Sequence, residues 1–215
     1  MTPDLFADQP TIWQEPLIPG AVVLRGQALM QADSLLATVS QLLVAAPLRH
    51  MLTPGGQAMS VAMSNCGQLG WISDRHGYRY SAQDPTTGQP WPAMPLSLQQ
   101  LAAQAAALAG FAGFEPDACL INRYQAGTRL SLHQDKDERD YTQPIVSISL
   151  GLPATFLFGG ARRTDPVRRI PLSHGDIVVW GGPARHHYHG VAPLKAGLHP
   201  LLGGQRINLT LRKAG

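Results

Sequence analysis

The 215-residue sequence contains little cysteine and little charge. Its two cysteines, Cys66 and Cys119, stand far apart and outside any CxxC motif. This usage argues against a disulfide framework or a zinc ribbon, and we expect two buried, reduced thiols. Charged residues form only 14% of the chain, so a cluster of them carries more information than usual. The net charge of +3 permits a polyanionic partner but does not indicate one.

Long hydrophobic runs are missing as well. No stretch approaches the roughly 18 uninterrupted apolar residues of a membrane span, and the N-terminal sequence MTPDLFADQP has neither the basic nor the apolar segment of a signal peptide. The sequence therefore predicts a cytoplasmic protein without a membrane segment, and we expect a monomer. With 44% hydrophobic residues, a chain of this length can form the core of one large domain without disulfides.

Two segments of the first half have the apolar spacing of amphipathic helices, residues 32–48 and 96–110. Between them, residues 53–95 are rich in glycine, proline and aromatic residues, which favours hairpins and loops. The expected helix ends follow from residues that cap exposed backbone groups or stop a helix. They are Asp33 or Ser34 and then Pro47 for the first helix, and Ser97 with Gln100 and then Gly110 for the second.

The second half has the pattern of short strands separated by turn residues. The expected strands are ACLINRY, TRLSLHQD, PIVSISLG, ATFLFGG, RRIPL, DIVVWGG, HHYHGV and RINLTLR. So many short strands within about 100 residues predict a sandwich, jelly roll or barrel. The fold class is therefore mixed α/β and mainly β.

The segment SLHQDKDE places a histidine beside three of the few acidic residues. In a strand, His133 and Asp135 point to the same face. Two histidines and one carboxylate on one side of an ion form the site of non-heme Fe(II) oxygenases, so a second histidine is needed. The segment RHHYHG offers His186, His187 and His189, and spacing alone does not choose between them. A solvated turn around residue 133 is the plainer alternative.

The C-terminal segment RINLTLR alternates strictly between polar and apolar residues. The plainer interpretation is an amphipathic strand with its polar face in water. However, arginine binds carboxylates through two parallel hydrogen bonds, so two arginines on one face also suit a dicarboxylate. Together with an iron that has open coordination positions, this suggests 2-oxoglutarate as a co-substrate. The residues concerned are Arg206, Asn208, Thr210 and Arg212, with Asn122 and Tyr124 sharing a face of INRY.

The sequence resembles the AlkB family of Fe(II)- and 2-oxoglutarate-dependent nucleic-acid demethylases. The resemblance rests on DACLINRY, LSLHQDKDE, PIVSISLG, DIVVWGG, YHGV and RINLTLR, and on DLFAD, WQEPL, TPGG, MSVAMSNCG, GWISDRHGYRY and PWPAMP, in this order. It implies a double-stranded β-helix, which is a jelly roll, with a nucleotide-recognition lid. Residues 1–112 would form an N-terminal extension with two supporting helices and the lid. Residues 113–215 would form the catalytic core of one integrated unit.

The resemblance also implies a role for individual residues. It places the metal on His133, Asp135 and His189, and it leaves His186 and His187 outside the family signature. It places 2-oxoglutarate against Asn122, Tyr124, Arg206, Asn208 and Arg212. It assigns Trp71, Tyr78, Arg79, Tyr80, Asp137 and Arg163 to the nucleic acid.

The implied activity is removal of small alkyl groups from bases such as 1-methyladenine and 3-methylcytosine. The implied substrate is single-stranded DNA, with duplex DNA and RNA as further substrates, and the reaction uses Fe(II), 2-oxoglutarate and O2. A flipped base fits between Trp71 and His133, and the carboxylate of Asp137 would favour a cationic base. The alternatives are an oxygenase that acts on proteins or small molecules, and a catalytically silent nucleic-acid-binding or zinc protein.

Overall fold

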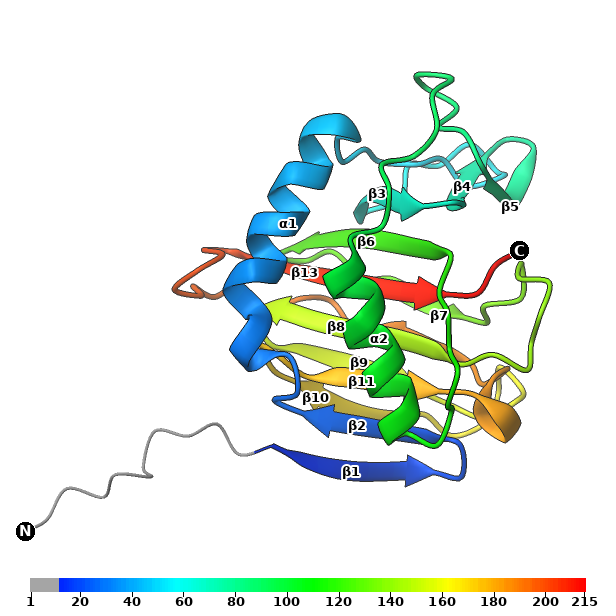
Figure 1. Ribbon diagram of the computed structural model, residues 1–215. Coiled ribbons are helices and arrows are strands. Elements are labelled where there is room, and N and C mark those ends of the chain that lie inside the picture. Colours follow the sequence, from blue (N-terminus) through cyan, green and yellow to red (C-terminus); the bar gives the residue numbers. More distant parts are fainter. Residues whose placement is uncertain (1–11) are drawn as a thin grey trace, which may run out of the picture.

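A computed structural model describes residues 12–215 of the chain (Figure 1). The segment DLFAD, which contributes to the family resemblance, lies outside the described residues. The helices are η1 (Leu29–Gln31), α1 (Ala32–Ala45), α2 (Leu96–Leu108) and η2 (Gly182–Ala184). The strands are β1 (Trp13–Ile18), β2 (Ala21–Arg25), β3 (Ala62–Gly67), β4 (Gly70–Asp74), β5 (Gly77–Ser81), β6 (Ala118–Gln125), β7 (Leu130–His133), β8 (Ile145–Gly151), β9 (Ala154–Phe158), β10 (Arg168–Leu172), β11 (Ile177–Trp180), β12 (His189–Val191) and β13 (Gln205–Arg212).

Over these residues the chain forms three layers. A seven-stranded antiparallel sheet has the order β1-β2-β11-β8-β13-β6-β3, and a four-stranded sheet has the order β10-β9-β12-β7. Helices α1 and α2 lie across the outer face of the larger sheet (Figure 1). Phe156 and Ile170 of the smaller sheet pack against Val178 and Trp180 of the larger one. This arrangement confirms the predicted jelly roll with supporting helices.

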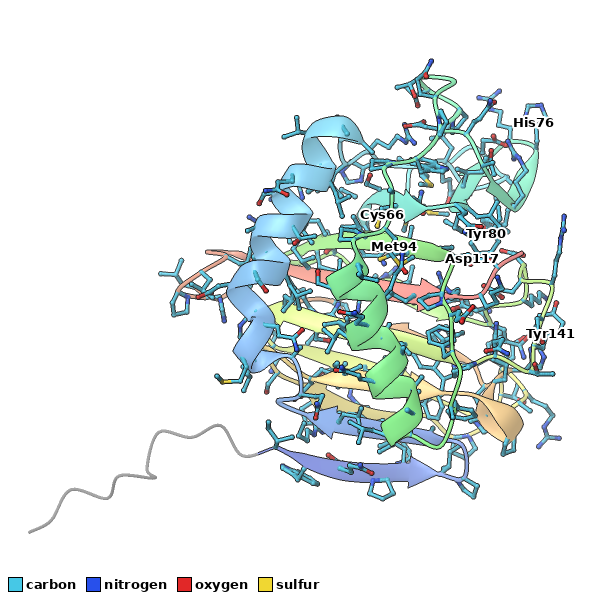
Figure 2. All side chains as sticks on the ribbon, in the orientation of Figure 1. Cys66, His76, Tyr80, Met94, Asp117 and Tyr141 are labelled. Carbon is cyan, nitrogen blue, oxygen red and sulfur yellow. The ribbon has the colours of Figure 1, made fainter. Side chains whose placement is uncertain are left out.

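The main core lies between the helices and the larger sheet. The apolar faces of the two helices meet the apolar side chains of β13, so the strict alternation in RINLTLR points Ile207, Leu209 and Leu211 toward the helices. Cys66 and Met94 belong to the same core (Figure 2). Both cysteines are buried and reduced within the described range, as expected. No helix among residues 12–215 is long and apolar enough to cross a membrane.

The helix positions agree with the sequence, but the predicted N-terminal caps are wrong. Helix α1 begins after Gln31 and α2 after Pro95, and neither cap residue makes a side-chain hydrogen bond. The Ser34 hydroxyl instead donates to the carbonyl of Gln31. The predicted role of Gly110 is confirmed, because it takes a φ of 90° and its N–H and that of Phe111 donate to carbonyls in the last turn of α2.

Residues 53–95 contain hairpin and loop structure, as predicted. Strands β4 and β5 form a two-stranded hairpin in which Trp71 pairs with Tyr80 and Ile72 with Arg79. Strand β3 precedes this hairpin and forms the edge of the larger sheet by pairing with β6. The hairpin is therefore anchored directly beside the strand that carries Asn122 and Tyr124.

The predicted strand HHYHGV is only half right. Strand β12 begins at His189, whereas residues 185–188 form a turn and irregular backbone after η2. The ring of His187 contacts the carbonyl of Gly159 through Nδ1, at 2.9 Å. His187 and His189 therefore do not share the face of one regular strand.

Candidate active site

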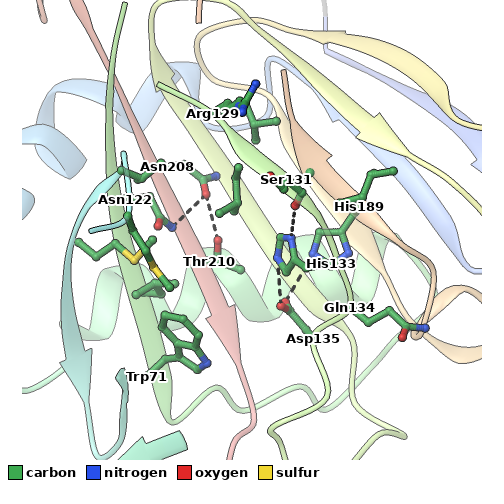
Figure 3. Close-up of a pocket in the computed structure, with 18 of the residues that line it drawn as sticks. Trp71, Asn122, Arg129, Ser131, His133, Gln134, Asp135, His189, Asn208 and Thr210 are labelled. Carbon is green, nitrogen blue, oxygen red and sulfur yellow. Dashed lines mark hydrogen bonds and ion pairs between the residues drawn. The ribbon is translucent and has the colours of Figure 1, made fainter. Parts of the chain in front are cut away.

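A cavity of about 660 Å³ opens between the two sheets (Figure 3). Its inner wall comes from β6, β8 and β13 of the larger sheet and from β7, β9 and β12 of the smaller one. Trp71 of the β4–β5 hairpin stands at its edge (Figure 3). The polar face of β13, which sequence alone could equally place in water, lines this cavity and is buried.

His133, Asp135 and His189 converge on one point of the cavity (Figure 3). Each offers one ligand atom, and these atoms lie within 4.8 Å of one another. The two histidines are directly opposite each other in the β7–β12 ladder. Nδ1 of His133 contacts the carbonyl of Ser131 at 2.9 Å, and Nδ1 of His189 contacts that of His187 at 3.0 Å. These contacts place the proton on Nδ1 and leave Nε2 of each ring free for a metal.

The charges around this trio match the needs of a cation site. Burial lowers the pKa of His189 to about 3, with a further contribution from His133, so the ring is neutral at neutral pH. Burial alone would raise the pKa of the Asp135 carboxyl. The charge of Arg212 and the contacts with the two histidines outweigh it and hold that pKa well below its usual range. The pKa of His133 is raised, because burial lowers it but the hydrogen bond and charge of Asp135 outweigh burial. The trio therefore presents one neutral imidazole, one carboxylate and a second imidazole from which a bound metal would displace the proton, and this donor set fits Fe(II).

Close contact between two strands fixes the spacing of the histidines. Gly190 follows His189, and a Cβ added there would lie 2.6 Å from the carbonyl oxygen of Leu130 and 3.1 Å from the carbonyl of Ser131. No real side chain tolerates the shorter distance. Only glycine therefore lets β12 approach β7 this closely.

The two other histidines of RHHYHG lie away from the trio. His187 stacks on Phe158, and His186 contacts the ring of Tyr141 at its edge. Among the residues that the structure describes, only His133, Asp135 and His189 form a cluster that could hold a metal. Spacing alone left this choice open, the family resemblance placed the third ligand on His189, and the fold brings His189 into the cluster.

Arg206 lies deep in the cavity and has spare hydrogen-bonding capacity. Its side chain is buried, its guanidinium lies 5.0 Å from the centre of the Tyr124 ring, and Nη2 donates to Oγ of Ser149 at 2.9 Å. Its Nε and Nη1 are buried without a hydrogen-bond partner in the described part of the protein. Buried donors in native proteins are nearly always satisfied, so this guanidinium fits a carboxylate that enters the cavity.

The neighbouring amides line the same wall. Asn208 donates from Nδ2 to Oγ of Ser147 at 2.8 Å and accepts from the hydroxyl of Thr210 at 3.0 Å. Nδ2 of Asn122 lies 3.5 Å from Oδ1 of Asn208, while Oδ1 of Asn122 has no partner among residues 12–215. Arg212 differs from Arg206, because it already donates twice to Oδ2 of Asp135, at 2.6 and 2.9 Å.

Four of the six residues assigned to the nucleic acid line the cavity: Trp71, Tyr78, Asp137 and Arg163. The rings of Trp71 and Tyr78 stack, with centroids 5.6 Å apart and planes 13° from parallel. The indole N–H of Trp71 donates to Oδ2 of Asp137 at 2.8 Å. The guanidinium of Arg163 lies 5.8 Å from the ring centre of Tyr188. Aromatic, acidic and basic groups therefore meet at the entrance.

The other two residues do not line the cavity. The guanidinium of Arg79 donates twice to the carboxylate of Asp74 within the hairpin, at 2.7 and 2.9 Å. The hydroxyl of Tyr80 donates to Oε1 of Glu138 at 2.7 Å. Their contacts hold the hairpin and tie it to the segment after Asp135.

Sequence reasoning missed a buried pair beside the trio, Glu138 and Arg185. Nη2 of Arg185 lies 3.0 Å from Oε2 of Glu138, and both side chains are almost fully buried. Glu138 belongs to the acidic segment SLHQDKDE and Arg185 begins the segment RHHYHG, but no pattern in the sequence indicated that the two side chains are buried or that they pair. Apolar and sulfur side chains of the cavity were also missed, and only the fold brings them here: Met59, Met63, Leu120, Phe156 and Trp180.

Comparison with known proteins supports this architecture. The family model of the 2OG-Fe(II) oxygenase superfamily matches residues 20–212. The alpha-ketoglutarate-dependent dioxygenase AlkB of Salmonella typhimurium is 62% identical over 98% of this chain and 97% of its own length. The protein of that name from Escherichia coli is 58% identical over 99% of this chain and 98% of its own length. The solved structure of OsALKBH1 superposes with a TM-score of 0.81 at 26% identity, covering 94% of this chain and all of that one. The chain therefore belongs to the AlkB family within the superfamily of Fe(II)- and 2-oxoglutarate-dependent oxygenases.

Proposed function

We propose that this dioxygenase removes alkyl groups from damaged bases of nucleic acids, with 1-methyladenine and 3-methylcytosine in single-stranded DNA as preferred substrates. Duplex DNA and RNA are further substrates in this proposal, and the protein acts as a cytoplasmic monomer. One observation carries the proposal. The His133–Asp135–His189 trio and the unpaired donors of Arg206 lie in one cavity, and its entrance is lined by stacked aromatic rings. A family relative in mouse bears the name nucleic acid dioxygenase.

In this proposal, His133, Asp135 and His189 hold Fe(II) through Nε2 of each ring and one carboxylate oxygen. When bound, iron with 2-oxoglutarate and O2 supplies oxidation of the N-alkyl carbon, with release of succinate, carbon dioxide and formaldehyde. The protein keeps two of the three ligands in the required protonation state. Arg212 holds Asp135 ionised, and burial keeps His189 neutral.

The wall formed by β6 and β13 would bind 2-oxoglutarate. Arg206 pairs with its distal carboxylate, because its buried Nε and Nη1 need acceptors. Asn122, Tyr124 and Asn208 orient the co-substrate through side chains on the same face of the sheet. Arg212 contributes positive charge between this wall and Asp135.

The entrance would bind the flipped base. Trp71 stacks on one face of the base, and His133 bounds the opposite side of the space. Asp137, held by the indole N–H of Trp71, presents a carboxylate that favours a cationic ring. Tyr78 and Arg163 contact the flanking backbone, while Arg79 and Tyr80 act indirectly by holding the hairpin.

The decisive experiment is mass analysis of a 1-methyladenine oligonucleotide incubated with the protein, Fe(II), 2-oxoglutarate and ascorbate in air. We expect loss of one methyl group per lesion and equimolar succinate. Controls omit 2-oxoglutarate or use His189→Ala. Succinate formation with an unchanged oligonucleotide would instead indicate a protein or small-molecule substrate. Nucleic-acid binding without any succinate would indicate a catalytically silent protein.

A further inference from the structure

Asp135 stands at the start of a segment without regular secondary structure. Strand β7 ends at His133, β8 begins at Ile145, and residues 134–144 between them form neither helix nor strand. Under the proposed function, this segment carries one metal ligand and the selective carboxylate Asp137. A backbone of this kind has no ladder of hydrogen bonds to hold it, so other contacts must fix its position.

Arg185 provides these contacts from the opposite side. Its side chain is 2% exposed and comes from the turn after η2. Nη1 donates to the backbone carbonyl of Asp135 at 2.7 Å, and Nε donates to that of Gln143 at 3.1 Å. Nη2 donates to the carboxylate of Glu138 at 3.0 Å. One planar guanidinium thus touches both ends and the middle of the irregular segment.

The same cluster reaches the lid and the second metal ligand. The other carboxylate oxygen of Glu138 accepts from the hydroxyl of Tyr80 in β5 and lies 3.4 Å from Nε of Arg212. The turn that begins at Arg185 leads directly into β12, which starts at His189. The buried charges balance, since Asp135 and Glu138 face Arg212 and Arg185. Displacing Arg185 would therefore disturb the trio and the hairpin together.

We propose that Arg185 is a positioning residue that clamps residues 135–143 and sets the geometry of both the metal trio and the base-recognition entrance. This inference rests on the proposed function for the roles of Asp135 and Asp137. The clamp needs the fork of a guanidinium, because three acceptors in different directions must be reached at once. Lysine keeps the charge but cannot span them. Arg185 touches no substrate, so its effect is transmitted through the segment.

The test compares Arg185→Lys with a matched control, Arg25→Lys. Arg25 is also a largely buried arginine that bridges two carboxylates, Glu15 and Asp176, and a backbone carbonyl, but it lies in β2, outside the cavity. Three quantities are measured for each protein: Mn(II) affinity by electron paramagnetic resonance, KM and kcat for a methylated oligonucleotide, and hydrogen exchange of residues 136–143. Melting temperature reports general destabilisation.

We expect Arg185→Lys to weaken Mn(II) binding on the order of 10- to 100-fold, as for other groups that orient metal ligands. It should also raise the oligonucleotide KM and speed exchange in residues 136–143. Arg25→Lys should lower the melting temperature and leave the other three quantities unchanged. If Arg185→Lys lowers the melting temperature as much as Arg25→Lys does, but keeps the wild-type Mn(II) affinity and oligonucleotide KM, the proposal is overturned.

A second variant keeps the test informative if Arg185→Lys does not fold. Glu138→Gln is nearly isosteric and weakens the central contact of the clamp, together with the contacts of Glu138 to Tyr80 and Arg212, so faster exchange in the same segment and weaker Mn(II) binding are expected. Unchanged values in Glu138→Gln would also refute the clamp. The proposed function fails separately, if the wild-type protein neither binds Mn(II) through the trio nor demethylates the oligonucleotide.

Discussion

Replacing Arg206 with methionine should change the affinity for 2-oxoglutarate and the stability of the protein in opposite directions. Methionine keeps an unbranched side chain that can cover the ring of Tyr124, so the substitution deletes a charge without opening a large cavity. Arg206 is 1% exposed and satisfies one donor through Ser149, while Nε and Nη1 have no acceptor within residues 12–215. A carboxylate of 2-oxoglutarate would be their natural partner.

The expected loss of affinity follows from the burial of the ion pair between Arg206 and the carboxylate of 2-oxoglutarate. Removing one partner of a buried, hydrogen-bonded charge pair costs about 2–5 kcal/mol, which corresponds to roughly 30-fold to several-thousand-fold weaker binding. Without 2-oxoglutarate the sign reverses, because an uncompensated buried charge destabilises the fold. Burial already lowers the pKa of Arg206, which reflects this cost. The methionine variant should therefore be at least as stable as the wild type when no ligand is present.

The assay is calorimetric titration of 2-oxoglutarate into the Mn(II) form, with melting temperatures recorded with and without the ligand. Wild type should gain about 2.7 kcal/mol of stability at a ligand concentration 100 times its Kd, and the variant should gain far less at the same concentration. Arg163→Met at the entrance serves as the control, with unchanged 2-oxoglutarate affinity and a higher oligonucleotide KM. An Arg206→Met Kd within about threefold of wild type, about 0.6 kcal/mol, would refute the reasoning.

Three further predictions concern the metal and the base. His189→Ala should abolish Mn(II) binding and turnover, whereas His187→Ala should retain most of both; the reverse result in Mn(II) titrations would show that the ligand is misassigned. Asp137→Asn should keep Mn(II) binding and substrate-free succinate formation but lose more kcat/KM on cationic 1-methyladenine than on neutral 3-methylthymine, and equal losses on the two lesions would contradict a role in charge selection. Trp71→Ala should raise the oligonucleotide KM on the order of 10-fold, since stacking on one aromatic ring contributes about 1–3 kcal/mol per base, and an unchanged KM would exclude that stack.

Periodicity in the sequence was sufficient for the two helices and for most strands of the second half, whereas β1 and β2 were not predicted and β12 was predicted only in part. The alternation in RINLTLR correctly placed the apolar residues on the helix side, because a strand has a strict two-residue period. Capping side chains were less informative. Asp33, Ser34, Ser97 and Gln100 all suit a helix start, yet 3₁₀ backbone before α1 and Pro95 before α2 set the ends without them.

The site was partly predictable for a related reason. His133 and Asp135 are only two residues apart, so they were expected to lie close together, although β7 ends at His133 and Asp135 lies in the irregular segment after it rather than in the predicted strand. Spacing did not choose His189 from the three histidines, whereas the family resemblance did, and the turn after η2 separates His186 and His187 from the strand that carries His189. The Arg185–Glu138 pair could not be predicted from the sequence, because the two residues are far apart in the chain. They meet only because the turn after η2 packs against the irregular segment.

Because Gly190 has no side chain, the backbones of β12 and β7 come into direct contact, and this contact sets the distance between the two histidines. A single methyl group there would work as a wedge, because the atoms it meets belong to the backbone of β7 and cannot turn aside. The gap that a metal must fill is thus set by the closest approach of two main chains rather than by flexible side chains. In a chain with an HxD pair and several later histidines, the histidine followed by glycine is accordingly the first one to test as the third ligand.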